Sequence, residues 1–218
     1  MKITYYLEVI SSWCSLAEPA WAELKTRYGS RVLFEWRIAQ MNPSDFGVST
    51  AQYDWFYRRS GMMALRPAMM KTGWFQAARN GIYLAQDLVA EAGRDFGVND
   101  DRIRLALTAA ALDEGRKVGE LAVAVEVGAK AAGIDPAELR ARTEAPETLA
   151  RIQASTARFH AHQVTQRPTF VLEDAIGDKA VFSGLITFPP LAAAVEAMLA
   201  DEAGYAAYAA HFGSLPSR

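Results

Sequence analysis

Ser11-Ser12-Trp13-Cys14 is the stretch that decides the fold of this chain. It follows an apolar run, Ile3 to Val9, that is typical of a buried strand, and a helical spacing of apolar residues begins just after it. The sequence therefore predicts a strand, a tight turn and a helix start in direct succession. Backbone N–H groups and the helix dipole stabilise a thiolate at such a helix start.

Composition limits the kinds of partner that the protein has. The chain has 218 residues, 51% of them hydrophobic and 22% charged, which predicts a packed core. A formal net charge of -2 argues against nucleic-acid and membrane partners. We expect a cytoplasmic protein, because no signal-peptide pattern and no run of roughly 18 apolar residues is present. Cys14 is the only cysteine, which excludes an intramolecular disulfide and predicts a free thiol.

The remaining pattern predicts an α/β fold with an insertion. Arg31 to Ile38 alternates like a strand, so the first strand, helix and second strand form a parallel crossover unit. Residues of about 45 to 155 are helical, with an aromatic and methionine-rich block at their start. Two strands near 168–172 and 180–183 and a last helix from Phe188 follow. We expect residues 1–44 and 156–218 to form one discontinuous domain that flanks an inserted helical domain, 45–155.

Three motifs in this order resemble the DsbA family of thioredoxin-fold proteins. The cytoplasmic branch of that family reads Cys-Pro-Trp-Cys-Tyr-Leu-Gly at its active-site turn, which aligns with residues 11–17, so that Ser11 replaces the first cysteine, Ser12 the proline, and Cys14 is the second cysteine. The resemblance implies a thioredoxin-like fold of the DsbA type with an inserted α-helical domain.

The other two motifs lie near the far end of the chain. Gln166-Arg167-Pro168-Thr169-Phe170 is similar to the family segment whose proline is cis and faces the active-site turn. Phe182-Ser183-Gly184 is similar to the run that precedes the last helix. The resemblance implies that the turn and Pro168 meet at one site, and that the residue before the proline, Arg167, pairs backbone-to-backbone with a bound peptide or glutathione cysteine. The Arg167 side chain would place a cation near a thiolate or carboxylate, or else be a solvated surface arginine.

The resemblance implies a thiol-disulfide oxidoreductase-family protein with a degenerate Ser-x-x-Cys site. It would act on small thiols or mixed disulfides through Cys14, helped by Ser11 and Pro168. Substrate or glutathione contacts are expected at a second set of residues: Ser12, Trp13, Arg167, Thr169 and Gly184. No permanently bound cofactor is expected; glutathione or another small thiol would be the co-substrate, and a homodimer through the Ala-rich helices is plausible.

Two alternatives stay open. Kappa-class glutathione transferases and 2-hydroxychromene-2-carboxylate isomerases carry Ser-Pro-Tyr-Ser at this turn, and Ser11 matches the serine beside the glutathione sulfur. Those enzymes also carry Gly-x-Asp-Arg after the last strand, whereas this chain has Gly184-Leu185-Ile186-Thr187 and lacks the carboxylate. The second alternative is a non-catalytic binding module, in which Ser11 only caps the helix and Cys14 is an inert core residue.

Further residues have a structural and a functional interpretation. The aromatic and methionine block from Phe46 to Phe75 is expected to be mostly core and lid lining, or else an apolar wall for a hydrophobic co-substrate. His160 and His162 would point about 200° apart on a helix, so we expect no metal site.

Overall fold

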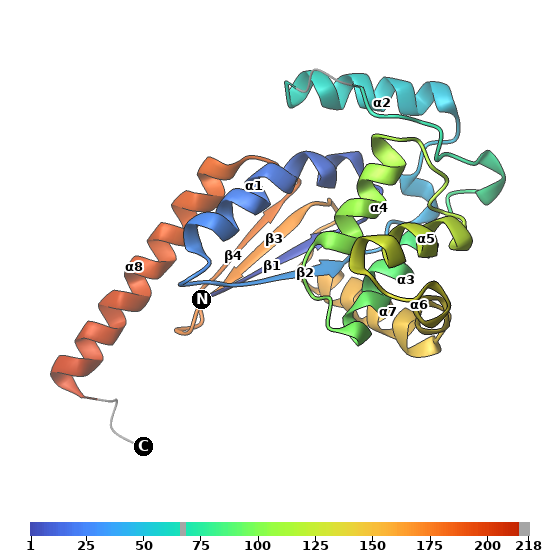
Figure 1. The fold of residues 1–218 in the computed structure, drawn as a ribbon. Coiled ribbons are helices and arrows are strands. Elements are labelled where there is room, and N and C mark those ends of the chain that lie inside the picture. The colour runs from blue at the N-terminus through green and yellow to red at the C-terminus, as the bar shows by residue number, and fades with distance from the viewer. Residues whose placement is uncertain (66–68, 214–218) are drawn as a thin grey trace.

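The fold is described from a computed structural model, which covers residues 1–65 and 69–213. Figure 1 shows a sheet with long helices along it and a block of shorter helices at one end. The elements in chain order are β1 (Lys2–Leu7), α1 (Ser12–Tyr28), β2 (Leu33–Ile38), α2 (Thr50–Met63), α3 (Ala85–Ala92), α4 (Arg102–Leu112), α5 (Leu121–Ala132), α6 (Pro136–Thr143), α7 (Pro146–Ala161), β3 (Thr169–Glu173), β4 (Lys179–Ser183) and α8 (Phe188–Phe212).

The sheet joins the two ends of the chain. Its strand order is β2-β1-β3-β4, with β1 parallel to β2 and antiparallel to β3, and with β3 antiparallel to β4. The central β1 residue Tyr5 is paired with Trp36 on one side and Phe170 on the other. The predicted parallel unit and the predicted hairpin are both confirmed, and the seam between β1 and β3 closes the sheet.

Alternation along β1 sends neighbouring tyrosines to opposite faces of the sheet. Tyr5 packs against Trp21 of α1 and Phe170 of β3, with ring centroids 5.1 and 4.7 Å away. Tyr6 packs on the other face against Phe159 of α7, at 5.8 Å. Helices thus cover both faces, α1 over one and α7 over the other.

A buried ion cluster joins the helical block to α1. Arg104 of α4 is 1% exposed and donates to Glu18 of α1 at 2.6 Å and to Asp101 at 2.6 Å. The Trp21 indole of α1 also donates to Asp101, at 3.3 Å. Farther along α4, the Thr108 hydroxyl donates to the Val9 carbonyl at 2.7 Å, which fixes the chain just before the turn.

Helices α2 to α7 lie between β2 and β3 in the chain, as the predicted insertion requires. The expected boundary at 155/156 falls inside α7, whose residue Phe159 packs on the sheet. The division at 44/45 and 155/156 stays a prediction. Within the described part of the chain, no helix combines the length and the apolar character that crossing a bilayer requires.

Candidate active site

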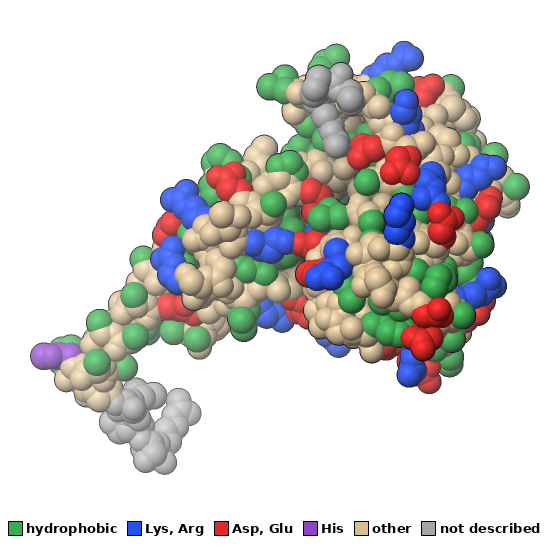
Figure 2. Space-filling view, in the orientation of Figure 1, with side chains coloured by type: hydrophobic (Ala, Val, Ile, Leu, Met, Phe, Trp, Pro, Cys, Tyr) green, Lys and Arg blue, Asp and Glu red, His purple; other side chains and the backbone are tan. Residues whose placement is uncertain are grey.

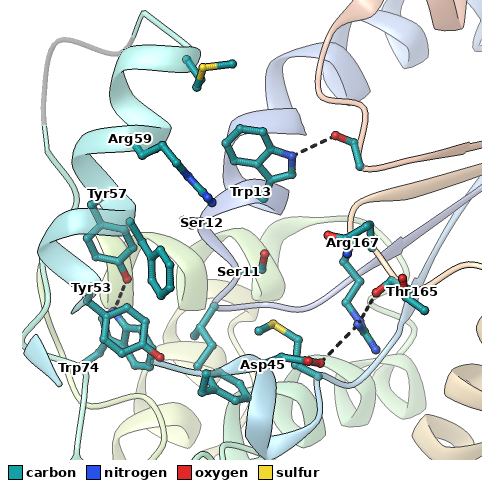
Figure 3. Close-up of a pocket in the computed structure, with 17 residues that line it drawn as sticks. Ser11, Ser12, Trp13, Asp45, Tyr53, Tyr57, Arg59, Trp74, Thr165 and Arg167 are labelled. Carbon is teal, nitrogen blue, oxygen red and sulfur yellow. Dashed lines mark hydrogen bonds and ion pairs between the residues drawn. The ribbon is translucent and has the colours of Figure 1, made fainter. Parts of the chain in front are cut away.

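A cavity of about 660 Å³ opens where the start of α1 faces α2. Its walls come from residues 10–13, the segment 41–46, α2, Trp74, residues 165–167 and Gly184 (Figure 3). It therefore brings together the turn near the N-terminus, the segment before β3 and the residue that follows β4. Ser11, Ser12, Trp13, Arg167 and Gly184 are the candidate residues that line it.

Ser11 is the N-cap of α1. Its backbone is extended (φ -74°, ψ 121°), and its hydroxyl oxygen accepts a hydrogen bond from the Cys14 N–H at 3.3 Å. Its own N–H donates to the Glu8 carbonyl at 3.1 Å, which closes the turn after β1. The residue thus caps the helix and also lines the cavity, so capping and ligand contact are compatible in one side chain.

Cys14 lies on the inner side of the same turn. Its side chain is 2% exposed, and it does not line the cavity. Burial raises the pKa of the Cys14 thiol to about 12, although hydrogen bonds from the Glu8 backbone and the Ser11 hydroxyl act in the opposite direction. The geometry therefore favours the interpretation of Cys14 as an inert core residue over the expected reactive thiol.

The two motifs near the C-terminal end, residues 166–170 and 182–184, contact the turn at the start of α1 through Gly184. The Arg167–Pro168 peptide bond is cis. The Gly184 N–H donates to the Pro168 carbonyl at 2.7 Å, and the Trp13 indole N–H donates to the Gly184 carbonyl at 2.9 Å (Figure 3). Pro168 and Thr169 are buried behind this wall and do not line the cavity. The Thr169 hydroxyl instead donates to the Gln166 carbonyl at 2.6 Å.

Arg167 is neither a solvated surface arginine nor a free cation in the site. Its side chain is buried, and its guanidinium donates to the carbonyls of Ala39 and of Gln40, the latter at 2.6 Å. Burial lowers the pKa of Arg167, while the charges of Glu8 and Asp45 oppose that shift. The Asp45 carboxylate lies 3.8 Å away on the cavity wall. Arg167 therefore holds the 39–45 segment in place.

A buried pair of carboxyl groups lies beneath the turn. Glu8 and Asp87 are both 0% exposed, and their carboxyl groups are hydrogen-bonded to each other. The Met41 N–H donates to Glu8 at 3.1 Å, and the Val9 N–H donates to Asp87 at 3.4 Å. Burial, and then the charge of Glu8, raise the pKa of Asp87 well above its usual range. The raised pKa favours the protonated form of Asp87, and the pair ties α3 to the turn and to the cavity wall.

The sequence does not predict which residues of α2 form the cavity wall. Tyr53, Phe56, Tyr57 and Arg59 of α2 line the cavity, with Trp74 behind them. The clustering of aromatic residues between 46 and 75 was the available signal, and it pointed both to core and to an apolar wall. The structure divides the block: Tyr53, Tyr57 and Trp74 are buried, whereas Trp55 and Met62 are exposed.

Across residues 1–65 and 69–213, no group of three or more His, Cys, Asp and Glu side chains is placed to hold a metal ion.

Comparison with known proteins relates the chain to others by structure alone. No protein-family model matches it, and no curated protein matches it by sequence. It is similar to the cytosolic disulfide reductase DsbM from Pseudomonas aeruginosa, with a TM-score of 0.68, 20% identity and coverage of 91% of this chain and 98% of that one. DsbM has also been solved with GSH, and that structure matches with a TM-score of 0.66.

A second similar structure is a 2-hydroxychromene-2-carboxylate isomerase, with a TM-score of 0.63, 16% identity and coverage of 94% of this chain and 99% of that one. At such identities the likeness concerns the fold. The sequence prediction of fold is thereby confirmed: the chain has the thioredoxin-like fold of the DsbA type, with a helical insertion between its second and third strands.

Proposed function

We propose that this protein is a thiol-dependent enzyme in which Ser11 contacts the sulfur of a small bound thiol such as glutathione. The observation that carries the proposal is the contrast within one turn of α1. Ser11 lines the cavity, whereas Cys14 is 2% exposed with a thiol pKa of about 12. The sulfur that reacts is therefore supplied by the co-substrate and not by the chain.

Ser11 suits this role chemically. Its oxygen accepts from the Cys14 N–H, and its hydroxyl hydrogen, which also reaches the Cys14 sulfur, can rotate to donate to a thiolate in the cavity. The first backbone N–H groups of α1 have no acceptor within the helix and add a partial positive charge at the same place. A hydrogen bond to a charged group stabilises it by about 1.5–3 kcal/mol. Ser11 would therefore lower the pKa of the bound thiol and raise its thiolate fraction.

The comparisons support a thiol as ligand without fixing the reaction. DsbM is described as a disulfide reductase and was solved with GSH, and the second neighbour is described as an isomerase. In a reductase reaction, the bound thiolate would attack one disulfide sulfur, form a mixed disulfide and release the other half of the substrate as a thiol. A second small thiol would then attack the mixed disulfide, form a disulfide with the first thiol and release the remaining half of the substrate as a thiol. A serine cannot replace either sulfur in that exchange.

The test compares Ser11→Ala with Cys14→Ala. Glutathione binding is measured by isothermal titration, and the thiol pKa of bound glutathione is measured from its thiolate absorbance. We expect Cys14→Ala to leave both values unchanged. Ser11→Ala should raise the pKa of the bound thiol by about one to two units, which corresponds to the loss of one hydrogen bond to a charged group.

The opposite pattern would support the second candidate, a mixed-disulfide reaction at Cys14. That candidate draws on the hydrogen bond from the Ser11 hydroxyl to the Cys14 sulfur. If glutathione does not bind to any of the three proteins, the proposal is refuted and the binding-module alternative gains support.

A further inference from the structure

We infer that the outer face of α2 binds the surface of an anionic phospholipid bilayer. This face points away from the cavity, so it is a second surface, separate from the proposed thiol site, and it needs no thiol. We call it the α2 ridge and define it by four residues: Trp55, Arg58, Met62 and Leu65.

Exposed apolar side chains are concentrated in and next to α2. Among the described residues, fourteen large hydrophobic side chains are exposed, and six of them lie between residues 48 and 69. Three of the six belong to the α2 ridge: Trp55, Met62 and Leu65 are 57, 77 and 89% exposed. Single exposed apolar side chains are ordinary on a protein surface, but a group of neighbours marks an interaction surface. Another surface is therefore expected to cover the α2 ridge.

The α2 ridge lies on the side of the helix opposite to its buried residues. Trp55, Arg58 and Met62 are spaced by three and four positions, so they share one face of α2. Tyr53 and Tyr57 are buried on the other face, toward the cavity (Figure 3). A helix that is apolar all round is normally covered on every side. The outer face of α2 thus has the composition of a contact surface.

Helix α2 stands at the edge of the molecule. Figure 1 shows it apart from the block of shorter helices, and Figure 2 shows hydrophobic and basic side chains along this edge, with acidic side chains below it toward the body. The surface is a projecting helix and not a groove. A bound peptide or partner helix needs a groove or a sheet edge to enter, whereas a flat bilayer meets a projecting helix without a clash.

The charge of α2 favours an anionic partner. Arg58 is exposed and lies between Trp55 and Met62, and it forms no ion pair within the described part of the chain. Arg59 lies 5.2 Å from the Trp55 ring, and α2 carries these two arginines against one acidic residue, Asp54. The net charge of the whole chain, -2, predicts no membrane partner, but that average does not describe this helix. Lipid phosphates would meet positive charge beside exposed apolar side chains.

The residue types of the α2 ridge suit the boundary between lipid headgroups and acyl chains. The ring of Trp55 is apolar with one polar N–H, the combination that is enriched at this boundary. Met62 and Leu65 would enter the apolar side, as the apolar face of an interfacial helix does. Arg58 can lay its methylene stem on that apolar surface and extend its guanidinium to a phosphate.

A second copy of the chain suits the α2 ridge less well. Two ridges that pack on each other would bring the Arg58 guanidinium groups of both copies together, and like charges repel. A stable protein interface also buries about 800 Å² on each side, from roughly 20–30 residues. The four residues of the α2 ridge provide much less than that.

The test measures binding of the full chain to vesicles by cosedimentation at increasing lipid concentration, without added thiol. The vesicles are an equimolar mixture of DOPC and DOPG, with pure DOPC as the neutral comparison. We expect the mixed vesicles to bind the protein at least about tenfold more tightly, because only they attract Arg58 and Arg59. Binding to them should weaken as NaCl is raised from about 0.05 to about 0.5 M, since salt screens this attraction.

Two variants separate the apolar and the charged parts of the α2 ridge. Met62→Ser combined with Leu65→Ser should weaken binding to the mixed vesicles by about tenfold or more, because two apolar side chains no longer leave water. Arg58→Gln should weaken it by about fivefold and leave binding to DOPC unchanged. All three positions are exposed, and thermal unfolding checks that each variant folds as the unchanged protein does.

Matched controls lie elsewhere on the surface. Tyr205→Ser combined with Tyr208→Ser removes two apolar side chains of α8 that are also more than half exposed. Arg158→Gln removes an exposed arginine of α7. Neither control should change the affinity for the mixed vesicles by more than about twofold.

No binding to the mixed vesicles, equal binding to both kinds of vesicle, or equal losses in the variants and their controls would overturn the inference. Two further measurements identify another occupant in that case. Self-association in light scattering that the Met62 and Leu65 changes abolish would assign the α2 ridge to a second copy. Binding of reduced, carboxymethylated lactalbumin, an unfolded acidic chain, that the same changes abolish would assign it to a polypeptide. Glutathione is absent from every sample, so failure here leaves the proposed function untouched.

Discussion

Ser11 and Cys14 are three positions apart on α1, yet their environments are opposite. The hydroxyl of Ser11 lies on the cavity wall, and the sulfur of Cys14 lies in the core. A buried thiol of raised pKa is largely protonated and poorly nucleophilic. At the scale of single residues, the polarity of the site therefore depends on Ser11.

Alkylation of Cys14 checks its environment directly. Because burial raises its pKa to about 12, the Cys14 thiol stays almost entirely protonated at neutral pH. We expect iodoacetamide to label native Cys14 much more slowly than the denatured chain, and we expect the native rate to rise steadily with pH up to the alkaline limit of stability. Mass spectrometry of quenched samples measures both rates. Native labelling as fast as that of the unfolded chain would contradict the buried position.

The raised pKa of Asp87, buried beside Glu8, predicts a pH effect on stability. A carboxyl whose folded pKa is raised contributes stability that is complete below its unfolded pKa and is lost as pH rises through the folded pKa. In Asp87→Asn, the amide donates to Glu8 at every pH. As pH rises above the ordinary pKa range of a carboxyl group, the variant should gain stability relative to the unchanged protein, by up to about 1.4 kcal/mol per pH unit.

Urea unfolding at several pH values measures this difference. Asp201→Asn, on an exposed position of α8, is the control and should follow the unchanged protein at every pH. A constant difference between Asp87→Asn and the unchanged protein across these pH values would show that no proton is held by the pair.

Residue roles were only partly predictable from sequence. Ser11, Trp13 and Gly184 follow from the order of motifs, because the fold places a helix start beside the segment before β3. The burial of Cys14 does not follow, since spacing cannot say which side of a helix start faces the core. Arg167 was judged as a surface or site cation, but its guanidinium bonds to carbonyls 127 and 128 residues away in the chain.

At the scale of elements, α1 and α4 are joined by Arg104. Arg104 is 1% exposed and lies between Glu18 and Asp101, so its removal leaves buried negative charge without a partner. Arg104→Met should therefore lower the free energy of unfolding by about 3–5 kcal/mol. Arg102→Met, at the first residue of the same helix, removes an exposed ion pair with Asp100 and should cost far less.

Denaturant unfolding of the two variants gives the comparison. Unfolding the same variants at low pH adds a second test. Burial alone would raise the pKa of Asp101, but Arg104 and Lys25 lower this pKa overall. The stability from Asp101 is present above its unfolded pKa and is lost as pH falls through the folded pKa. The cost of Arg104→Met should accordingly shrink below about pH 4. Equal costs for the two variants would show that the cluster does not join the helices.

The helices and strands were more predictable from the sequence than the roles of single residues. Alternation and capping signals identify β1, β2, the β3–β4 hairpin and helix α6. The N-cap of α6, Asp135, accepts hydrogen bonds from the backbone N–H groups of Ala137 and Glu138. The role of α2 was less predictable, because its aromatic residues are at once buried and cavity-lining. Tyr57 shows why: its ring is 3% exposed, yet it lines the cavity.

At the scale of the whole molecule, the end of α8 projects from the body (Figure 2). The buried residues of α8 end at Met198, and Tyr205, Tyr208 and Phe212 are more than half exposed. A chain that ends at Ala203 retains the bonds of Glu202 to the N-terminus and to Ala175. We expect its thermal midpoint to stay within about 2 °C of that of the full chain, because little buried apolar surface is removed.

Scanning calorimetry of both chains checks this, with light scattering to record the oligomeric state. A midpoint lower by about 5 °C or more would mean that another surface covers this helix in solution. The expected homodimer through the helical block stays a prediction, since a single chain contains no interface between copies.

The seam between β1 and β3 has a consequence for biosynthesis. Lys2 is paired with Glu173, and Gly184 closes the site beside Trp13, so these partners leave the ribosome far apart in time. The central strand β1 lacks its β3 neighbour until residues 169–173 have been translated. The helical segment, whose contacts are mostly between neighbours in sequence, has no such delay. The cavity would therefore be complete only once Gly184 has been translated, and premature termination upstream of Gly184 would release a chain without the site.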